Sequence, residues 1–191
     1  MRRETSRAIV LVATLLVAAA PPLVAQREFE VPTRAPADAP AAVTMVDAGE
    51  PGAPLLVSGQ VVGADGPVSE VSVFAYQTDA EGIYSDVGNR RPRIRGYART
   101  DDEGRFELRT IRPASYPGTR VQQHIHFHLA PPGDEGHETV GEIVFDDDPR
   151  LSERQRSDPA FVVCAPRPGS DGVEVCAVTL RLRASRGAGS G

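Results

Sequence analysis

Short alternating segments separated by turn-forming residues are the feature that most constrains the fold of this chain. Residues 55–75, LLVSGQVVGADGPVSEVSVFA, hold two β-like segments on either side of a GADGP turn. Residues 94–111, IRGYARTDDEGRFELRTI, repeat the scheme around DDEG, and RVQQHIHFHLAPPG and GHETVGEIVFDDDP follow. No stretch shows a long helical period. We therefore predict an all-β fold, a single β-sandwich of about seven to eight strands.

Residues 1–25 are expected to lie outside this domain. MRRETSR is a short basic stretch, and the apolar run AIVLVATLLVAAAPPLVA ends in small residues. This pattern predicts a secretory signal peptide that is cleaved after Ala25. The alternative is a membrane anchor, which Pro21, Pro22 and the modest length of the run disfavour. We expect an exported protein, periplasmic or secreted, without stable membrane insertion after cleavage; the Sec and twin-arginine routes both stay open.

The rest of the chain divides into three parts. Residues 26–54 are rich in Pro and Ala and show no apolar period, which predicts a linker or a strap lying over the domain. Residues 55–183 hold the predicted sandwich, and residues 184–191 are expected to form a flexible tail. The net charge of -5 argues against a nucleic-acid partner, because such proteins normally present a basic face.

The two cysteines, Cys164 and Cys176, lie in the β-like runs FVVC and VEVCAVTL. If these runs form a hairpin, the two thiols can face each other. A disulfide is then expected in an exported chain. Metal binding by this pair is disfavoured, because the spacing matches no zinc motif.

Three of the four histidines lie at alternating positions in HIHFH, residues 124–128. In a strand they share one face, and neighbours on that face lie roughly 6.5–7 Å apart at their Cα atoms. Two imidazoles can bind one metal from that spacing, whereas His124 and His128 are too far apart. The spacing leaves two ligand pairs open, His124 with His126 or His126 with His128. The alternative is a polar strand face with exposed histidines.

Two tyrosines lie in loops beside the predicted strands, Tyr84 in DAEGIYSD and Tyr116 in TIRPASYPG. Imidazole alone does not name a metal, but two tyrosinate oxygens would favour a hard trivalent ion, Fe(III), over zinc or Cu(I). A bound Fe(III) would hold both phenols ionised. Spacing alone favours ordinary packing for these tyrosines, with an apolar ring and a hydroxyl that finds a partner.

Taken in order, the motifs resemble the intradiol ring-cleavage dioxygenases of the catechol and protocatechuate 3,4-dioxygenase type. The resemblance runs from about Gly59 to Pro149 and comprises G-x-Y, R-G-x-x-x-T-D-x-x-G, T-I-x-P-x-x-Y-P and H-I-H-F. It implies a non-haem Fe(III) cofactor whose ligands are Tyr84, Tyr116, His124 and His126. His128 falls outside the pattern. The short chain and its export signal resemble a small exported branch of the family.

The resemblance also implies an activity, in which O2 cleaves a catechol-type substrate to a cis,cis-muconate-type diacid. Tyr116 is implied as a catalytic residue that takes a substrate proton. Arg120 is implied as the group that stabilises charge on the ring, although it lies four residues before His124, where three is usual. Glu142 stands where a glutamine often precedes F-x-x-D-P, and a carboxylate there would repel an anionic substrate.

Two other functions stay open. A non-catalytic transthyretin-like module of exported proteins shares G-x-V-x-x-x-x-G-P-V-x-x-V-x-V and T-D-x-x-G-R-F, but it has no reason to carry H-I-H-F with two upstream tyrosines. It is favoured if Tyr84 faces away from the histidines. An exported protein that binds copper or zinc at the same residues is the other alternative.

Overall fold

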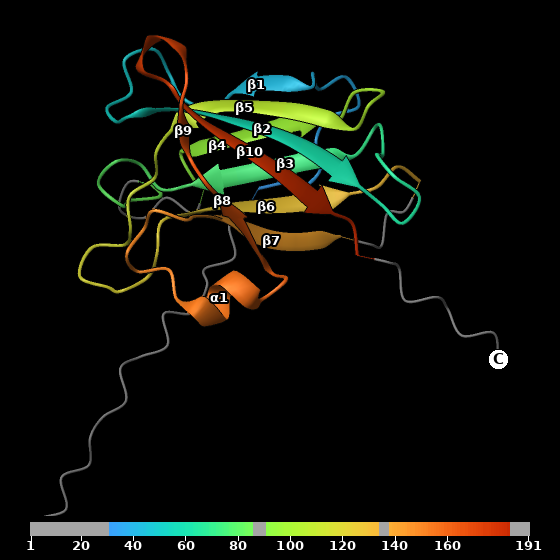
Figure 1. Ribbon diagram of the computed structural model, residues 1–191. Coiled ribbons are helices and arrows are strands. Elements are labelled where there is room, and N and C mark those ends of the chain that lie inside the picture. Colours follow the sequence, from blue (N-terminus) through green and yellow to red (C-terminus); the bar gives the residue numbers. More distant parts are fainter. Residues whose placement is uncertain (1–30, 86–90, 134–137, 184–191) are drawn as a thin grey trace, which may run out of the picture.

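Two β-sheets pack face to face in the computed structural model, which describes residues 31–85, 91–133 and 138–183 (Figure 1). The first sheet contains, in spatial order, β1 (Ala42–Thr44), β5 (Arg105–Ile111), β2 (Pro54–Val62), β10 (Glu174–Arg181) and β9 (Arg167–Pro168). The second contains β4 (Ile94–Arg99), β3 (Ser72–Gln77), β6 (His124–Ala130), β7 (Thr139–Phe145) and β8 (Phe161–Cys164). The helices described are α1 (Glu153–Ser157) and the 3-10 turn η1 (Ser170–Gly172).

The predicted all-β sandwich is confirmed, but the described parts of the chain hold ten strands, where seven to eight were expected. The additional strands are short: β1 has three residues and β9 two. Such lengths are too short to show an alternating pattern in the sequence. The predicted signal peptide and the predicted tail lie outside the described residues. Among the residues that the structure describes, none of the helices has the length and apolar character needed to cross a membrane.

Strand β6 lies at the centre of the second sheet, antiparallel to both β3 and β7. Ile125, Phe127 and Leu129 belong to the hydrophobic core between the sheets. Each buried side chain of this size contributes about 1.5–3 kcal/mol to folding. A slip of one residue would move all three out of the core, so the core holds the histidines in between on the opposite face.

The predicted turns connect the two sheets. GADGP carries the chain from β2 in the first sheet to β3 in the second, and DDEG carries it from β4 back to β5. Each turn therefore joins strands that do not pair with each other. The two strands that each turn joins lie in opposite sheets.

The segment before β2, where a linker or strap was expected, closes one side of the sandwich. Its strand β1 pairs in parallel with β5, and Met45 is buried next to β4. A Cβ atom added to Gly96 of β4 would lie only 2.7 Å from Met45 Cγ, so the absence of a side chain there makes room for the segment. The Tyr97 hydroxyl and the Arg99 guanidinium donate hydrogen bonds to the carbonyl oxygens of Pro32 and Pro36.

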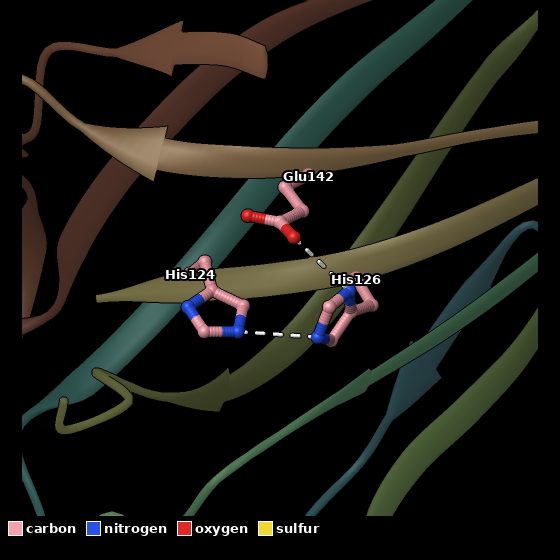
Figure 2. Close-up of side chains that lie close together, drawn as sticks. All are labelled: His124, His126 and Glu142. Atoms are coloured by element: carbon pink, nitrogen blue, oxygen red, sulfur yellow. Dashed lines mark hydrogen bonds and ion pairs between the residues drawn. The ribbon is translucent and has the colours of Figure 1, made fainter. Parts of the chain in front are cut away.

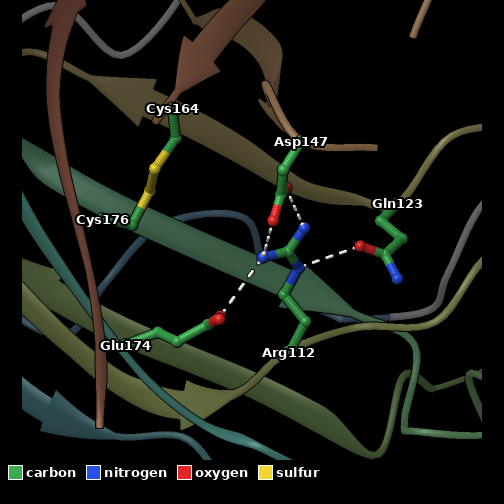
Figure 3. Close-up of a disulfide and its surroundings, with 6 residues drawn as sticks. All are labelled: Arg112, Gln123, Asp147, Cys164, Glu174 and Cys176. Atoms are coloured by element: carbon green, nitrogen blue, oxygen red, sulfur yellow. Dashed lines mark hydrogen bonds and ion pairs between the residues drawn. A yellow bond between two sulfur atoms is a disulfide. The ribbon is translucent and has the colours of Figure 1, made fainter. Parts of the chain in front are cut away.

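Cys164 and Cys176 form a disulfide that joins the two sheets (Figure 3). The predicted hairpin is wrong, since β8 pairs with β7 in one sheet and β10 pairs with β2 in the other. Both strands find longer parallel partners, and both cysteines are fully buried in the core between the sheets. The bond therefore links the layers of the sandwich.

Arg112 connects four segments close to the disulfide (Figure 3). Its guanidinium donates to Gln123 Oε1 at 2.9 Å, forms ion pairs with Asp147 and Glu174, and lies 4.0 Å above the centre of the Phe145 ring. Cation–π contact and paired carboxylates together satisfy a charge that is mostly withdrawn from water. The start of the loop that leads to β6 is thereby attached to β7 and β10.

We predict that removal of the disulfide lowers stability without changing the fold. The cysteines are separated by 12 residues, and a loop of this size closed by a disulfide contributes about 3 kcal/mol. The double variant Cys164→Ala, Cys176→Ala should therefore unfold at lower urea concentration than the oxidised wild type, by about that free energy. Equal unfolding midpoints would contradict the prediction, and the wild type in reductant serves as the control.

Candidate metal centre

Four donor atoms from three segments of the chain meet at one point beside β6. The distance between the Tyr84 and Tyr116 hydroxyl oxygens is 2.6 Å. His124 Nε2 lies 2.9 Å from the Tyr116 oxygen and 3.1 Å from His126 Nε2, which lies 2.9 Å from the Tyr84 oxygen. Two phenol oxygens and two imidazole nitrogens thus form a closed ring of contacts. The structure brings together the four residues that were predicted as ligands.

The second nitrogen of each imidazole faces an acceptor. His124 Nδ1 lies 2.8 Å from the carbonyl oxygen of Gln122, which can only accept, so Nδ1 carries the proton and Nε2 a lone pair. Figure 2 shows His126 with Nε2 toward His124 and Nδ1 toward the carboxylate of Glu142, 3.6 Å away. His124 therefore presents an Nε2 lone pair at the point where His126 Nε2 and the Tyr116 oxygen also lie, 3.1 and 2.9 Å away. Two imidazole nitrogens and two phenol oxygens fit a metal ion that prefers nitrogen and oxygen ligands.

Burial keeps both phenols and the His126 imidazole uncharged in the metal-free chain. It raises the pKa of the Tyr84 phenol, and to a smaller extent the neighbouring Tyr116 does so too. Burial likewise raises the pKa of Tyr116. The pKa of His126 is lowered to about 3 by burial, and further by the adjacent His124 and His128. A bound cation would supply the positive charge that ionises the phenols.

His126 is flanked by the residues opposite it on the neighbouring strands. Tyr76 of β3 and Glu142 of β7 both stand in register with His126. The Tyr76 ring stacks on the imidazole, with ring centres 4.6 Å apart and planes at 21°. Burial, with the nearby Tyr116 and Glu142, raises the pKa of Tyr76 to about 12. Sequence analysis missed Tyr76, because the register of β3 against β6 is not visible in the chain.

Two further predicted residues stand apart from the four donors. His128 lies one pleat beyond His126, and its Nδ1 is 3.2 Å from a carboxylate oxygen of Glu138. His128 is not among the side chains that meet at the centre, which agrees with its position outside the family pattern. Arg120 is exposed on the loop before β6. No hydrogen bond or ion pair joins Arg120 to the four donors within the described parts of the chain, so its role stays a prediction.

A family model described as "Dioxygenase" matches residues 29–157, which is more than half of the chain. The chain belongs to the intradiol ring-cleavage dioxygenase family.

Several members of this family are similar to the chain. 6-Chlorohydroxyquinol 1,2-dioxygenase of Cupriavidus pinatubonensis is 35% identical over 117 residues, 51% of this chain and 41% of that protein. Catechol 1,2-dioxygenase 2 of Acinetobacter lwoffii is 31% identical over 124 residues, 55% of this chain and 44% of that protein. The chain thus spans less than half the length of these curated relatives.

Solved structures share the fold. The dioxygenase domain of a dioxygenase carbohydrate-binding protein fusion from Streptomyces sp. SirexAA-E has a TM-score of 0.60 at 29% identity. That match covers 83% of this chain and 97% of the Streptomyces chain. Catechol 1,2-dioxygenase from Pseudomonas arvilla C-1 also has a TM-score of 0.60, at 21% identity, and covers 85% of this chain and 63% of that one.

In this intradiol dioxygenase family member, Gly82 of the G-x-Y motif allows the two tyrosine loops to touch. Its φ of 83° lies in the left-handed region, where residues with a side chain are strained. A Cβ atom at this position would lie 2.2 Å from the carbonyl oxygen of Ser115, the residue before Tyr116. Only glycine lets the Tyr84 loop approach the Tyr116 loop this closely, so the motif reflects the assembly of the metal centre.

We predict that Gly82→Ala separates the two tyrosines. Gly118→Ala is the matched control, because Gly118 has a similar φ of 71° but open space within 4 Å of its Cβ position. Gly82→Ala should cost roughly 1–3 kcal/mol more than the control, since only it adds an overlap with backbone. Urea unfolding measures the difference. Equal losses in the two variants would mean that the close approach of the loops is unimportant.

Asp79 holds the loop that carries Tyr84. One carboxylate oxygen accepts hydrogen bonds from the backbone N–H groups of Glu81 and Ile83, each at 2.9 Å, and the other accepts from Arg93 at 3.1 Å. The backbone N–H of Arg93 in turn donates to the carbonyl oxygen of Tyr84 at 2.7 Å. Burial raises the pKa of Asp79, but these hydrogen bonds together outweigh it and lower the pKa below its ordinary value.

We predict that the contribution of Asp79 to stability depends on pH. Because its pKa is lowered in the folded state, the contribution is present above the unfolded pKa of about 4 and is lost as pH falls through the folded pKa. The difference in unfolding free energy between wild type and Asp79→Asn should therefore shrink from pH 6 to pH 3. The hydrogen bond from Arg93 also lowers the pKa of Glu50. Glu50 is present in both proteins, so its titration does not enter the difference. A difference that stays constant over this range would contradict the prediction.

Proposed function

We propose that the chain is a non-haem Fe(III)-dependent dioxygenase that cleaves a catechol-type aromatic ring between its two hydroxylated carbons. The co-substrate is O2, both of whose atoms enter the product, a cis,cis-muconate-type diacid. No nucleic acid or other macromolecular partner is part of this function. The proposal extends to this chain an activity that the names of its relatives state for those proteins.

The observation that carries the proposal is the meeting of two phenol oxygens with two imidazole Nε2 atoms. Tyr84, Tyr116, His124 and His126 would hold the iron. Tyrosinate is a hard, anionic oxygen donor, and the pair would stabilise the trivalent state of iron. When bound, the iron would supply Lewis-acid activation of the catechol for its reaction with O2.

The chain's own residues would position the substrate and move its protons. Tyr116 is the less buried of the two tyrosines, and we assign to its oxygen the acceptance of one catechol proton on substrate entry. Tyr76 covers one face of His126 and would keep water from that side of the centre. Arg120 remains the candidate for stabilising charge on the ring. Arg120→Gln should then raise KM or lower kcat while leaving iron binding unchanged.

The position of Tyr84 argues against a transthyretin-like module. That alternative is favoured if Tyr84 faces away from the histidines, but its oxygen lies 2.9 Å from His126 Nε2. A protein that binds zinc at the same four residues is distinguishable by colour, since ferric iron bound by tyrosinate absorbs visible light and zinc does not; elemental analysis of the purified protein separates iron from copper.

We also propose that the protein is exported. The supporting features are the basic and apolar sequence of residues 1–25 and the disulfide between Cys164 and Cys176. Disulfides persist in oxidising compartments and are rare in the cytosol. Detection of the mature chain in the periplasm or the medium, with its N-terminus at Gln26, tests this proposal.

We predict that the Fe(III)-loaded protein is coloured and that the colour depends on both loop tyrosines. Tyr84→Phe and Tyr116→Phe should each lose or shift the visible absorption band, and O2 uptake with catechol should fall by at least about 100-fold. Anaerobic addition of catechol should shift the band in the wild type. The measurements are a visible spectrum and an oxygen electrode trace.

Tyr97→Phe is the matched control for these variants. Tyr97 is part of β4, and its hydroxyl donates to the carbonyl oxygen of Pro32; among the described residues it forms no hydrogen bond with the four donors. Its loss should leave the band and the O2 uptake at wild-type values. A wild type that stays colourless after loading with Fe(III) would refute the proposed function.

A further inference from the structure

The carboxylate of Glu142 lies between His126 and Gln122. One oxygen faces His126 Nδ1 at 3.6 Å, which is too long for a hydrogen bond. The other oxygen accepts a hydrogen bond from the side-chain amide of Gln122, at 3.3 Å. Glu142 is partly buried, and burial raises the pKa of its carboxyl group. A carboxylate in such a place needs a donor to keep its orientation.

Gln122 is itself held by helix α1. Its amide oxygen accepts a hydrogen bond from Gln155 Nε2 at 2.8 Å, and Gln122 is only 4% exposed. Gln155 belongs to the capping box of α1, in which its amide oxygen accepts from the backbone N–H of Ser152 at 3.0 Å and from the Ser152 hydroxyl at 2.7 Å. A chain of side-chain contacts therefore runs from the helix end to His126.

The backbone N–H of Ser152 sets the direction of this chain. A backbone N–H only donates, so the oxygen of Gln155 must face it and the NH2 group of Gln155 must face Gln122. The amide oxygen of Gln122 accepts this hydrogen bond from Gln155, so the NH2 group of Gln122 points at Glu142. Both amides are thereby fixed in one of their two flip states, and a donor is always presented to the carboxylate.

Helix α1 contributes little to the hydrophobic core. It has five residues, and none of them is buried. It lies beside β8 at the end of the second sheet (Figure 1). The capping box of this short, exposed helix fixes Gln155, and Gln155 in turn holds Gln122. This contact is a clearer role for the helix than packing against the core.

We propose that Gln122 and Gln155 are positioning residues that hold the Glu142 carboxylate behind His126 and thereby fix the orientation and tautomer of this ligand. The proposal rests on the proposed function in one respect, that a metal binds at His126 Nε2. Outer carboxylates that face the far nitrogen of a histidine ligand orient the ring and increase its basicity. The glutamines are assigned no contact with substrate.

Glu142 is also a candidate for a metal ligand in its own right. Donor atoms of His124, His126 and Glu142 lie within 4.8 Å of one another, and two histidines with one carboxylate are a known iron-binding set. The nitrogen of His126 that lies closer to the carboxylate is Nδ1, however, whereas Nε2 lies 2.9 Å from the Tyr84 oxygen. Figure 2 shows Glu142 on the Nδ1 side of the His126 ring and His124 on its Nε2 side.

The test uses two variants that interrupt the chain of contacts at different points. Gln155→Glu keeps the oxygens that accept from Ser152, so the helix cap survives, but a carboxylate cannot donate to Gln122. Gln122→Ala removes the amide without adding charge. Ser152→Ala weakens the cap and leaves its backbone N–H in place, and Glu153→Gln changes an exposed charge on the same helix. The last two are the controls.

Imidazole 15N NMR of the metal-free full chain at pH 7 is the first readout. His126 of the wild type should show one tautomer, with the proton on Nδ1. In Gln155→Glu and Gln122→Ala a second tautomer should appear, whereas the two controls should match the wild type. Identical His126 spectra in all five proteins would overturn the proposal, and this result does not depend on iron or on activity.

Release of Fe(III) to a chelator is the second readout. It should be about tenfold faster in Gln155→Glu and Gln122→Ala than in the controls, the size typical for loss of an outer partner of a metal ligand. Equal acceleration in Ser152→Ala would show a merely structural effect and overturn the proposal. Complete loss of iron in Glu142→Gln would identify Glu142 as a metal ligand and would also overturn the proposal. A wild type that binds no iron would refute the proposed function, while the NMR comparison would still decide the role of the glutamines.

Discussion

Strand β6 faces the hydrophobic core with one side and the candidate metal centre with the other, and this constraint governs the rest of the structure. Because side chains alternate along a strand, burial of Ile125 and Phe127 directs His124 and His126 to the opposite face. The apolar side chains contribute stability, and the histidines are held in place without having to contribute any. The strand also lies between β3 and β7, so residues on both neighbours flank the histidines.

The two tyrosines are supplied by loops, which require separate support. The Tyr84 loop is held by the Asp79 carboxylate, and the two loops are joined where Gly82 meets the carbonyl oxygen of Ser115. The segment between the second loop and β6 is anchored by buried Asp148, which accepts from the backbone N–H of Gln123 at 2.6 Å. Donor atoms on loops are held less precisely than donor atoms on strands, so these supporting contacts are needed to fix the two phenols. Four side chains from three segments can then share one centre.

The strands themselves could be predicted from the sequence, but their partners could not. The alternation in residues 55–75 and 94–111 correctly indicated strands and turns. The turns nevertheless join strands of different sheets, and the two cysteine strands are partners across the core instead of a hairpin. Local pattern reports which side of a strand is apolar, whereas pairing depends on which other strands compete for its edges. Very short strands such as β1 and β9 carry too few residues for any pattern.

The sequence by itself determined which types of donor side chain, phenol and imidazole, are available for the candidate centre. The motifs G-x-Y, Y-P and H-I-H each place such donors at set positions along a loop or strand. Spacing left open whether His126 acts with His124 or with His128. Only the tertiary structure placed His124 with the tyrosine hydroxyls and His128 beside Glu138. It also decided that Tyr76 stacks on His126, and that Gln155, Gln122 and Glu142 form one chain of contacts. These contacts join residues far apart in sequence, so they depend on strand register and on the packing of α1, which no local pattern encodes.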